Sequence, residues 1–399
     1  MTSSPPTSSL ASSVTPSTPA VAGRVPAPDI ARGAMLLLIA IANVSYWASG
    51  AADNPEAFTL IDRIWLLLRT GLVDGRAYPL FAALFGFGLA TIAMRRNTDG
   101  TDPVPARRLL RRRGWWLIAF GGLHALLFAG DIIGLYGLIA VVFAGWIARG
   151  RLRAMAVVGI LVTSIFIVST LGYDPQDTEM MLGGVGGGAG GGMPDLGIPW
   201  PWGNLGLWAI GGVLAIFASG VLPAVLAGVG ISRTTWITDP DRHRRLLTAV
   251  AAGGLTVGFL ASLPFGLYVS GLSTELPAGA WTVNSVGTFL SAAGWLALFA
   301  LLGGSRNPDR PGALRRITTA VGQRSMTAYI GQTLIFLPVF WLLGRTGHLA
   351  SLGPAATGGI AVLTWCAMAT VAYLLHMQGR RGPFEVALRH LIARTERRR

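Results

Sequence analysis

Lysine is absent from this chain, and charge of either sign is scarce. Only 13% of the 399 residues are charged, whereas 52% are hydrophobic, and all 32 basic residues are arginines. Charged residues make up about a quarter of a typical soluble globular protein. A water-soluble fold could not bury so much apolar surface, so the composition excludes that class and favours an integral membrane protein.

Cysteine is nearly absent as well. Cys366 is the only one, which excludes an intramolecular disulfide and a cysteine-based metal site. It lies inside an apolar run, so we expect a small buried hydrophobic residue. Four of the five histidines are scattered along the chain without the spacing of metal ligands. We therefore expect neither a metal site nor a tightly bound cofactor. These histidines are His243, His348, His376 and His390.

The beginning of the chain has neither charge nor a long apolar run. Residues 1–23 are mainly Ser, Thr, Pro and Ala, a composition typical of disordered segments. A cleavable secretion signal needs an apolar stretch directly after positive charge, and none is there. The sequence predicts a disordered cytoplasmic tail over residues 1–23 and a single transmembrane domain over residues 24–399.

Long apolar runs dominate the rest of the chain. A helix that crosses about 30 Å of hydrocarbon needs roughly 17 to 25 mostly apolar residues. The sequence therefore predicts an all-α, polytopic membrane helical bundle with about ten transmembrane helices. The runs are 34–50, 77–94, 114–130, 132–148, 154–172, 205–230, 247–271, 280–303, 326–343 and 357–377.

The positions of the arginines test this division independently. Loops on the cytoplasmic side of membrane proteins carry the excess of basic residues. The two terminal segments and every second loop hold 28 of the 32 arginines, in clusters between apolar runs that do not resemble a nucleic-acid-binding face. The pattern predicts both termini in the cytoplasm. The exceptions are Arg63, Arg69, Arg76 and Arg345.

Two of the loops predicted to lie on the non-cytoplasmic side have distinctive sequences. Apolar residues recur at helical spacing between Ile61 and Leu72, which predicts a helix lying in the outer membrane interface. Residues 183–192 are nearly all glycine. They follow no strand, so a flexible outer loop is favoured over a phosphate-binding loop.

One histidine lies deep in an apolar run. His124 follows Gly114 by ten residues, which places it about 15 Å into the third span, near the bilayer midplane. Asp131 comes two helical turns later on nearly the same face. The pair could be a general base with a carboxylate partner, or a helix-packing hydrogen bond. We expect no direct contact between them unless the helix breaks at Gly130.

Polar residues also mark the first span. Asp29 and Arg32 precede it at a spacing of three, which predicts a pair that stabilises the helix terminus. Asn43 lies inside the span and needs hydrogen-bond partners, so we expect it to face the interior of the bundle.

Five ordered motifs extend from about Arg24 to Leu391. The motifs are Arg24-Val25-x-x-Pro28-Asp29-x-x-Arg32-Gly33 with Asn43; Phe81-x-x-Leu84-Phe85-Gly86-x-Gly88; Arg111-Arg112-Arg113, Gly121, Leu123-His124, Gly130-Asp131-Ile132 and Leu135-Tyr136; Gly322-Gln323-Arg324-Ser325-Met326-Thr327-x-Tyr329 with Gln332; and Gly382-Pro383-Phe384-Glu385 with Arg389. Together they resemble the motifs of the bacterial DUF418 family, the YeiB-like membrane proteins. Met35, Leu38 and Ala82 depart from the family pattern, which weakens the expectation of close helix packing around the first span.

The resemblance implies a multi-pass protein of the bacterial cytoplasmic membrane, with residues 302–399 covering the C-terminal part of the DUF418-like region. The family is distantly similar to transmembrane acyltransferases, which move an acyl group from a cytoplasmic acyl-CoA to an acceptor through an intramembrane histidine. By this analogy His124 is the base or the site of acyl transfer, and Asp131 is its partner. The residues implied in binding the acyl donor or substrate are Arg111, Arg112, Arg113, Asn43, Arg32, Asp29, Tyr136 and Gln332.

Other interpretations stay open. The resemblance also implies a transporter or permease for a small organic solute, in which His124 and Asp131 would relay protons or bind substrate. No internal repeat is visible, which argues weakly against this. A non-catalytic envelope protein is the third interpretation, and positive-inside anchoring or anionic lipid would then account for Arg107 to Arg113. The expected partners are the lipid bilayer, acyl-CoA and an unknown acceptor.

Overall fold

All regular structure in the described part of the chain is helical, which confirms the predicted class. The computed structural model describes residues 26–49, 51, 55–97, 102–171, 200–304 and 312–397. The predicted tail over residues 1–23 and the glycine-rich loop 183–192 lie outside these ranges. The α-helices are α1 (Ala27–Trp47), α2 (Leu60–Leu72), α3 (Ala77–Arg96), α4 (Val104–Ala125), α5 (Ile133–Arg149), α6 (Leu152–Ser169), α8 (Trp202–Ala218), α9 (Val221–Ile231), α10 (Arg244–Val269), α11 (Ala280–Gly303), α12 (Ala313–Gln323), α13 (Ser325–Arg345), α14 (Pro354–Met377) and α15 (Pro383–Arg397).

Several of these helices can cross a membrane. In the described ranges, seven segments are long and apolar enough, or eight if the bent pair α8 and α9 makes one span. Each of the ten predicted runs overlaps a helix, but two of these helices fall short of a span. α4 begins with an arginine-rich stretch, and α5 has only 17 residues. The multi-pass architecture is confirmed, while a count of ten depends on including α4 and α5.

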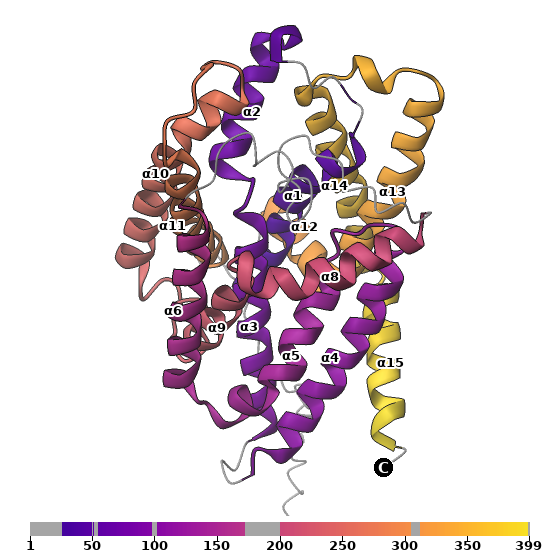
Figure 1. The fold of residues 1–399 in the computed structure, drawn as a ribbon. Helices are drawn as coiled ribbons and strands as arrows, with labels where there is room; N and C mark the ends of the chain where they lie inside the picture. The colour runs from indigo at the N-terminus through magenta and orange to yellow at the C-terminus, as the bar shows by residue number, and fades with distance from the viewer. Residues whose placement is uncertain are drawn as a thin grey trace, which may run out of the picture.

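Residues 205–230, predicted as one span, form two helices at an angle. α8 and α9 are bent by 57° relative to each other. Gly220 lies between them at φ 68°, a left-handed conformation that glycine adopts without steric cost. Figure 1 shows α8 lying crosswise over α4 and α5 instead of along the bundle. The sequence did not predict this bend, because an apolar run reflects burial or lipid contact and not the direction of the helix.

The predicted interfacial helix also has a different orientation. α2 forms over the expected residues, and Thr59 caps it by accepting a hydrogen bond from the Asp62 amide. It does not lie apart from the spans, however. α2 and α3 follow one another through a short break, so that Leu60–Arg96 makes one candidate span of 37 residues.

The two largest apolar cores of the described bundle share α3. The larger core joins α1, α13 and α14, with Leu80 and Leu84 from α3. The other joins α5 and α9, with Ala82 and Leu89 from α3. Alternate faces of α3 therefore link the two halves of the molecule.

α3 and α9 approach each other through a reciprocal pair of glycines. A Cβ on Gly86 would overlap the Val225 carbonyl, and a Cβ on Gly228 would overlap the Ala83 carbonyl. Small residues at such crossings let helix backbones pack closely, which matters in lipid because apolar association between helices gains little there. Gly86 of the second sequence motif therefore has a packing role.

α1 and α12 are in contact in the same way. A Cβ on Gly33 would overlap the Thr318 carbonyl, and a Cβ on Gly322 would overlap the Asp29 carbonyl. Gly33 and Gly322 come from the first and fourth sequence motifs. The two motifs thus meet in space at one helix crossing.

Three helix ends that carry arginines, those of α3, α5 and α15, lie together at one end of the bundle. The last turn of α3 meets that of α15, where Arg96 Nη2 lies 3.1 Å from Glu396 Oε1. It also meets the last turn of α5, where Asn97 Nδ2 donates to the Ala148 carbonyl at 3.2 Å. These ends belong to segments predicted to face the cytoplasm, and Figure 1 shows the C-terminus at the same end.

Three of the four exceptional arginines are held by protein groups. Arg63 donates to backbone carbonyls, including that of Pro55 at 2.8 Å. Arg69 Nε lies 3.0 Å from Asp74 Oδ1. Arg76 is 1% exposed, and its Nη2 donates to Asn284 Oδ1 at 3.0 Å. Internal contacts therefore explain why these residues depart from the arginine distribution.

Cys366 is exposed on α14, so the prediction of a buried residue was wrong. A membrane helix has apolar residues on its lipid-facing side as well as on its core-facing side. An apolar neighbourhood in the sequence therefore does not distinguish the two environments.

Candidate functional site

His124 lies where α4 ends and the chain folds back. α4 ends at Ala125, and two amides of the following turn donate to the His124 carbonyl. The returning chain places Asp131 Oδ1 2.8 Å from His124 Nδ1. The two residues were not expected to touch unless the helix broke at Gly130. The helix ends before that glycine, and the side chains meet.

The second ring nitrogen of His124 is occupied as well. His124 Nε2 lies 2.9 Å from Thr333 Oγ1 of α13. All three side chains are buried, since His124 is 4%, Asp131 5% and Thr333 4% exposed. A carboxylate beside Nδ1 favours the tautomer with its proton there, which leaves Nε2 to accept a hydrogen bond from the hydroxyl. Carboxylate, imidazole and hydroxyl in this order are the arrangement that activates a hydroxyl nucleophile.

Thr333 was missing from the predicted site residues. A threonine inside an apolar helix gives no chemical signal in the sequence, because it also serves as a helix-packing residue. Thr333 and His124 are 209 positions apart. Only the packing of α13 on α4 brings them together.

Asp131 occupies a position that suits a negative charge. It precedes α5, and its Oδ2 accepts a hydrogen bond of 2.8 Å from the Gly134 amide in the first turn of that helix. Unpaired amides and the positive end of the helix dipole favour a carboxylate at such a terminus. This offsets part of the cost of burying the charge.

Glycines leave the space in which the Asp131 side chain lies. A Cβ on Gly121 would lie 2.6 Å from Asp131 Oδ2, and it would overlap the Gly134 amide. A Cβ on Gly134 would overlap the indole of Trp208 on α8. α8 therefore covers the Asp131 side of the site, and Gly121 of the third motif is needed for its geometry.

Gly121→Ala should displace Asp131 from His124, whereas Gly122→Ala should not. The new methyl at position 122 would meet the Trp208 ring at 3.6 Å, an ordinary contact. We expect Gly121→Ala to lower the free energy of unfolding by about 1–3 kcal/mol, because overpacking forces neighbouring groups to move. Thermal unfolding of the two purified variants measures this. Equal melting temperatures would contradict the close contact at Gly121.

Aromatic rings surround the imidazole on its other sides. The Tyr329 and Phe128 ring centroids lie 5.2 and 5.8 Å from that of His124, both in edge arrangements. Trp47 of α1 stacks on Phe128 at 5.8 Å. The site therefore has an apolar wall, which strengthens the electrostatic interactions inside it.

Gln332 and Asn43 lie along the neighbouring surfaces of α1 and α13. Gln332 Nε2 donates to the Leu36 carbonyl at 3.0 Å, while its buried Oε1 has no hydrogen-bond partner in the described chain. Asn43 is half-buried one turn before Trp47 and makes no hydrogen bond within the described residues. Both predicted residues thus lie next to the helix segments that frame His124.

Tyr136 belongs to the packing of α5 on α3. Its hydroxyl donates to the Tyr78 carbonyl at 3.1 Å. Its ring stacks on those of Phe81 and Phe85 with centroids 5.3 and 5.1 Å apart. Both the hydroxyl and the ring of this predicted site residue are engaged there.

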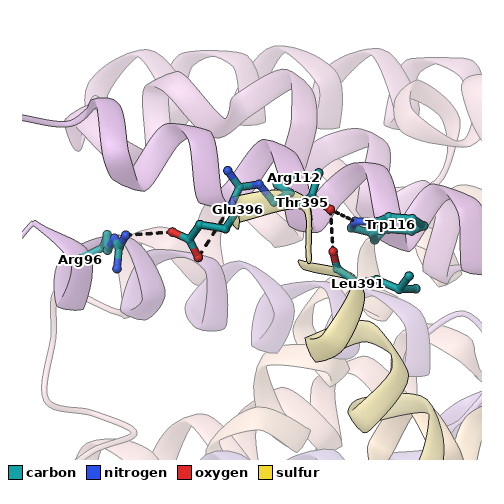
Figure 2. Close-up of polar contacts among 6 residues, drawn as sticks. All are labelled: Arg96, Arg112, Trp116, Leu391, Thr395 and Glu396. Atoms are coloured by element: carbon teal, nitrogen blue, oxygen red, sulfur yellow. Dashed lines mark hydrogen bonds and ion pairs between the residues drawn. The ribbon is translucent and has the colours of Figure 1, made fainter. Parts of the chain in front are cut away.

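The predicted arginines of α4 have different surroundings. Arg111 is exposed, whereas Arg112 Nη1 lies 3.7 Å from Glu396 Oε2. Figure 2 shows Glu396 of α15 between Arg96 and Arg112, with the Trp116 indole donating to Thr395 nearby. These contacts fix α15 along the first half of α4.

Asp29 and Arg32 of α1 form the predicted pair. Arg32 Nη1 lies 3.3 Å from Asp29 Oδ1, and Arg32 Nη2 donates to the Leu84 carbonyl of α3 at 3.4 Å. Asp29 is 2% exposed. The pair therefore joins α1 to α3 in addition to stabilising the helix terminus.

The two C-terminal motifs pack on each other. Glu385 Oε1 accepts hydrogen bonds from the Met326 and Thr327 amides at 2.8 and 3.1 Å, and Glu385 Oε2 accepts one from the Thr327 hydroxyl at 2.6 Å. These amides belong to the first turn of α13, where a carboxylate is stabilising. Glu385 thereby supports the helix that carries Thr333.

Comparison with known proteins identifies one family region. Residues 231–395 match the family described as "Protein of unknown function (DUF418)", which confirms the resemblance seen in the sequence. The match includes Thr333 and Glu385, while His124 and Asp131 lie before it. No curated protein and no solved structure matches the chain. Within the described ranges, no group of three or more His, Cys, Asp or Glu residues could hold a metal ion.

Proposed function

We propose that this protein with a DUF418 region is a membrane-embedded acyltransferase that takes an acyl group from acyl-CoA and passes it to an acceptor yet to be identified. The observation that carries the proposal is the chain of hydrogen bonds Asp131–His124–Thr333, at 2.8 and 2.9 Å. These three groups supply a nucleophile, a base and an orienting carboxylate. An arginine-rich helix end lies on the same helix as the base.

In the first half-reaction the Thr333 hydroxyl attacks the thioester carbonyl. His124 Nε2 takes the hydroxyl proton, and Asp131 stabilises the imidazolium that forms. The carbon–sulfur bond then breaks, and the proton on His124 passes to the departing thiolate. The products are free CoA and an ester on Thr333 Oγ1.

In the second half-reaction an acceptor hydroxyl or amine attacks this ester. His124 takes the acceptor's proton and returns it to Thr333 Oγ1 as the ester bond breaks. The imidazole is suited to this relay and not to carrying the acyl group itself. Both of its ring nitrogens are already in hydrogen bonds, so an acyl-histidine would require the contact with Thr333 to break.

Access to these groups requires a covering element to move, because each of the three residues is at most 5% exposed. α8 is the element suited to this, since it lies crosswise outside the main bundle in Figure 1. It also carries two buried donors, Asn204 Nδ2 and Trp208 Nε1, without a hydrogen-bond partner in the described chain. Displacing α8 would make these donors available to an acceptor molecule.

The proposal is tested by binding and self-acylation of the detergent-purified protein. Acetyl-CoA and longer acyl-CoAs carrying a labelled acyl group are added to wild type and to His124→Gln. We expect saturable binding by both proteins and stable labelling of wild type alone. A folded wild-type protein that binds no acyl-CoA would contradict the proposal and favour the solute-transport alternative.

A further inference from the structure

Arg113 differs from its two neighbours on α4. Arg111 is exposed, and Arg112 is paired with Glu396. Arg113 is half-buried, and its Nε is sealed from solvent without a hydrogen-bond partner in the described chain. Buried guanidinium groups are costly without partners, so a native site of this kind calls for an explanation.

Two further arginines lie near Arg113, on two other helices. Burial and the like charges of Arg32 on α1 and Arg389 on α15 all act against the positive charge of Arg113. Like charges held together in a partly dehydrated place repel each other strongly. The fold therefore brings the guanidinium groups of Arg32 and Arg389 close enough to act against the charge of Arg113.

The carboxylates around this cluster engage groups other than Arg113 and Arg389. Asp29 Oδ1 lies 3.3 Å from Nη1 of Arg32, a member of the cluster. Glu385 accepts its hydrogen bonds from the first turn of α13. Glu396 is paired with arginines of α3 and α4. Within the described residues, no carboxylate therefore forms an ion pair with Arg113 or Arg389.

A glycine of the second motif lies next to the Arg32 guanidinium of the cluster. A Cβ on Gly88 of α3 would lie 3.1 Å from Arg32 Nη2, closer than most side-chain contacts. A larger side chain at this position would press directly on the Arg32 guanidinium. The motif glycine thus lets the Arg32 guanidinium lie against α3, where its Nη2 donates to the Leu84 carbonyl.

The cluster also has a defined position relative to His124. Arg113 and His124 are eleven residues apart on α4, which is three turns on one helix face and about 16 Å. The cluster lies toward the end of the bundle where the arginine-bearing helix ends gather. A ligand held there by its anionic group could extend along α4 toward the buried site.

We infer that Arg113, Arg32 and Arg389 form a binding site for a phosphate-bearing ligand with two or more negative charges. Guanidinium groups bind phosphate oxygens through paired, charge-assisted hydrogen bonds, and several of them match a diphosphate or a phosphomonoester. The ligand is either the phosphate end of a soluble molecule such as CoA or the headgroup of an anionic lipid. In the first case the site deepens the proposed function by holding the acyl donor.

Two matched pairs of variants test the site with probes that carry no acyl group. Pyrophosphate and free CoA are titrated by calorimetry into full-length protein in phosphatidylcholine nanodiscs. We expect Arg113→Gln to weaken binding about tenfold or more, while Arg111→Gln changes it less than about twofold. Arg389→Gln should likewise weaken binding more than Arg394→Gln, and both of these residues are exposed on α15, so folding is preserved. Binding should also weaken as salt is raised.

The lipid composition of the nanodisc distinguishes a lipid headgroup from a soluble phosphate-bearing ligand. If the site holds a lipid headgroup, phosphatidylglycerol in the nanodisc should abolish pyrophosphate binding to wild type, and mass spectrometry should find less copurified anionic lipid on Arg113→Gln. If it holds a soluble phosphate, CoA binding should survive in phosphatidylglycerol. Equal behaviour of Arg113→Gln and Arg111→Gln towards all probes would overturn the inference. Binding at this site without self-acylation would leave it standing and count against acyl transfer alone.

Discussion

Asp131→Asn should slow self-acylation by about 10²- to 10⁴-fold, the size of effect seen when the carboxylate that orients a catalytic histidine is neutralised. The asparagine amide has nearly the same shape as the carboxylate that contacts His124 Nδ1 at 2.8 Å. It lacks the charge that stabilises an imidazolium, and it no longer selects the tautomer in which Nε2 is an acceptor. The initial rate of acyl incorporation from labelled acyl-CoA measures the loss.

Acyl-CoA binding is the control for this variant. The dissociation constant should stay within about threefold of wild type, because Asp131 is buried at the far end of the proposed site from the arginines. Thr333→Ser keeps a hydroxyl at Nε2 and should retain most of the rate. A folded Asp131→Asn protein that acylates at the wild-type rate would show that the hydrogen-bonded chain serves packing and not chemistry.

Gly228→Ala should cause a large loss of stability, whereas Gly230→Ala should cause none. The added methyl at position 228 would overlap the Ala83 carbonyl on α3, while position 230 has open space around it. A backbone carbonyl cannot rotate away as a side chain can, so relief requires α3 and α9 to separate. We expect a loss of about 2–3 kcal/mol in the free energy of unfolding.

Gly230→Ala is a matched control for Gly228→Ala, because both glycines lie on α9 and undergo the same substitution. Gly230→Ala can gain up to about 1 kcal/mol from the higher helix propensity of alanine. Thermal unfolding followed by size-exclusion chromatography measures both variants. Equal melting temperatures for the two would show that α3 and α9 do not pack through this crossing in the folded protein.

Much of the fold follows from two regularities in the sequence. Apolar runs of membrane-spanning length predict the helices, and the alternation of arginine clusters predicts which helix ends lie together. Both depend on the bilayer, which acts on every residue in the same way. The directions of α2 and α8 do not follow, because helix tilt is set by packing against neighbours and leaves no periodic signal.

The candidate site was predictable only in part. A histidine and a carboxylate two turns apart on one helix predict a pair, and the resemblance of the motifs before residue 231 to the DUF418 family pointed to the same residues. Their direct contact depends on where α4 ends, and helix ends are poorly defined by an apolar run. Thr333 could not be predicted, since its role arises from contact between helices distant in the chain.

The environments of the three consecutive arginines of α4 could not be predicted from the sequence either. Arg111, Arg112 and Arg113 are equivalent in the sequence, and all three were predicted to bind the acyl donor. Their separate environments depend on the helix face that each one occupies. Arg112 pairs with Glu396, whereas the charges of Arg32 and Arg389 act on Arg113.

The most direct test of the account is to locate the acyl group on the protein. Purified wild type is incubated with acyl-CoA, digested, and examined by tandem mass spectrometry, with Thr333→Ala and His124→Gln alongside. We expect an acyl ester on Thr333 in wild type and no acylated peptide from either variant. An acyl group on His124 or elsewhere, or labelling that persists in Thr333→Ala, would contradict it.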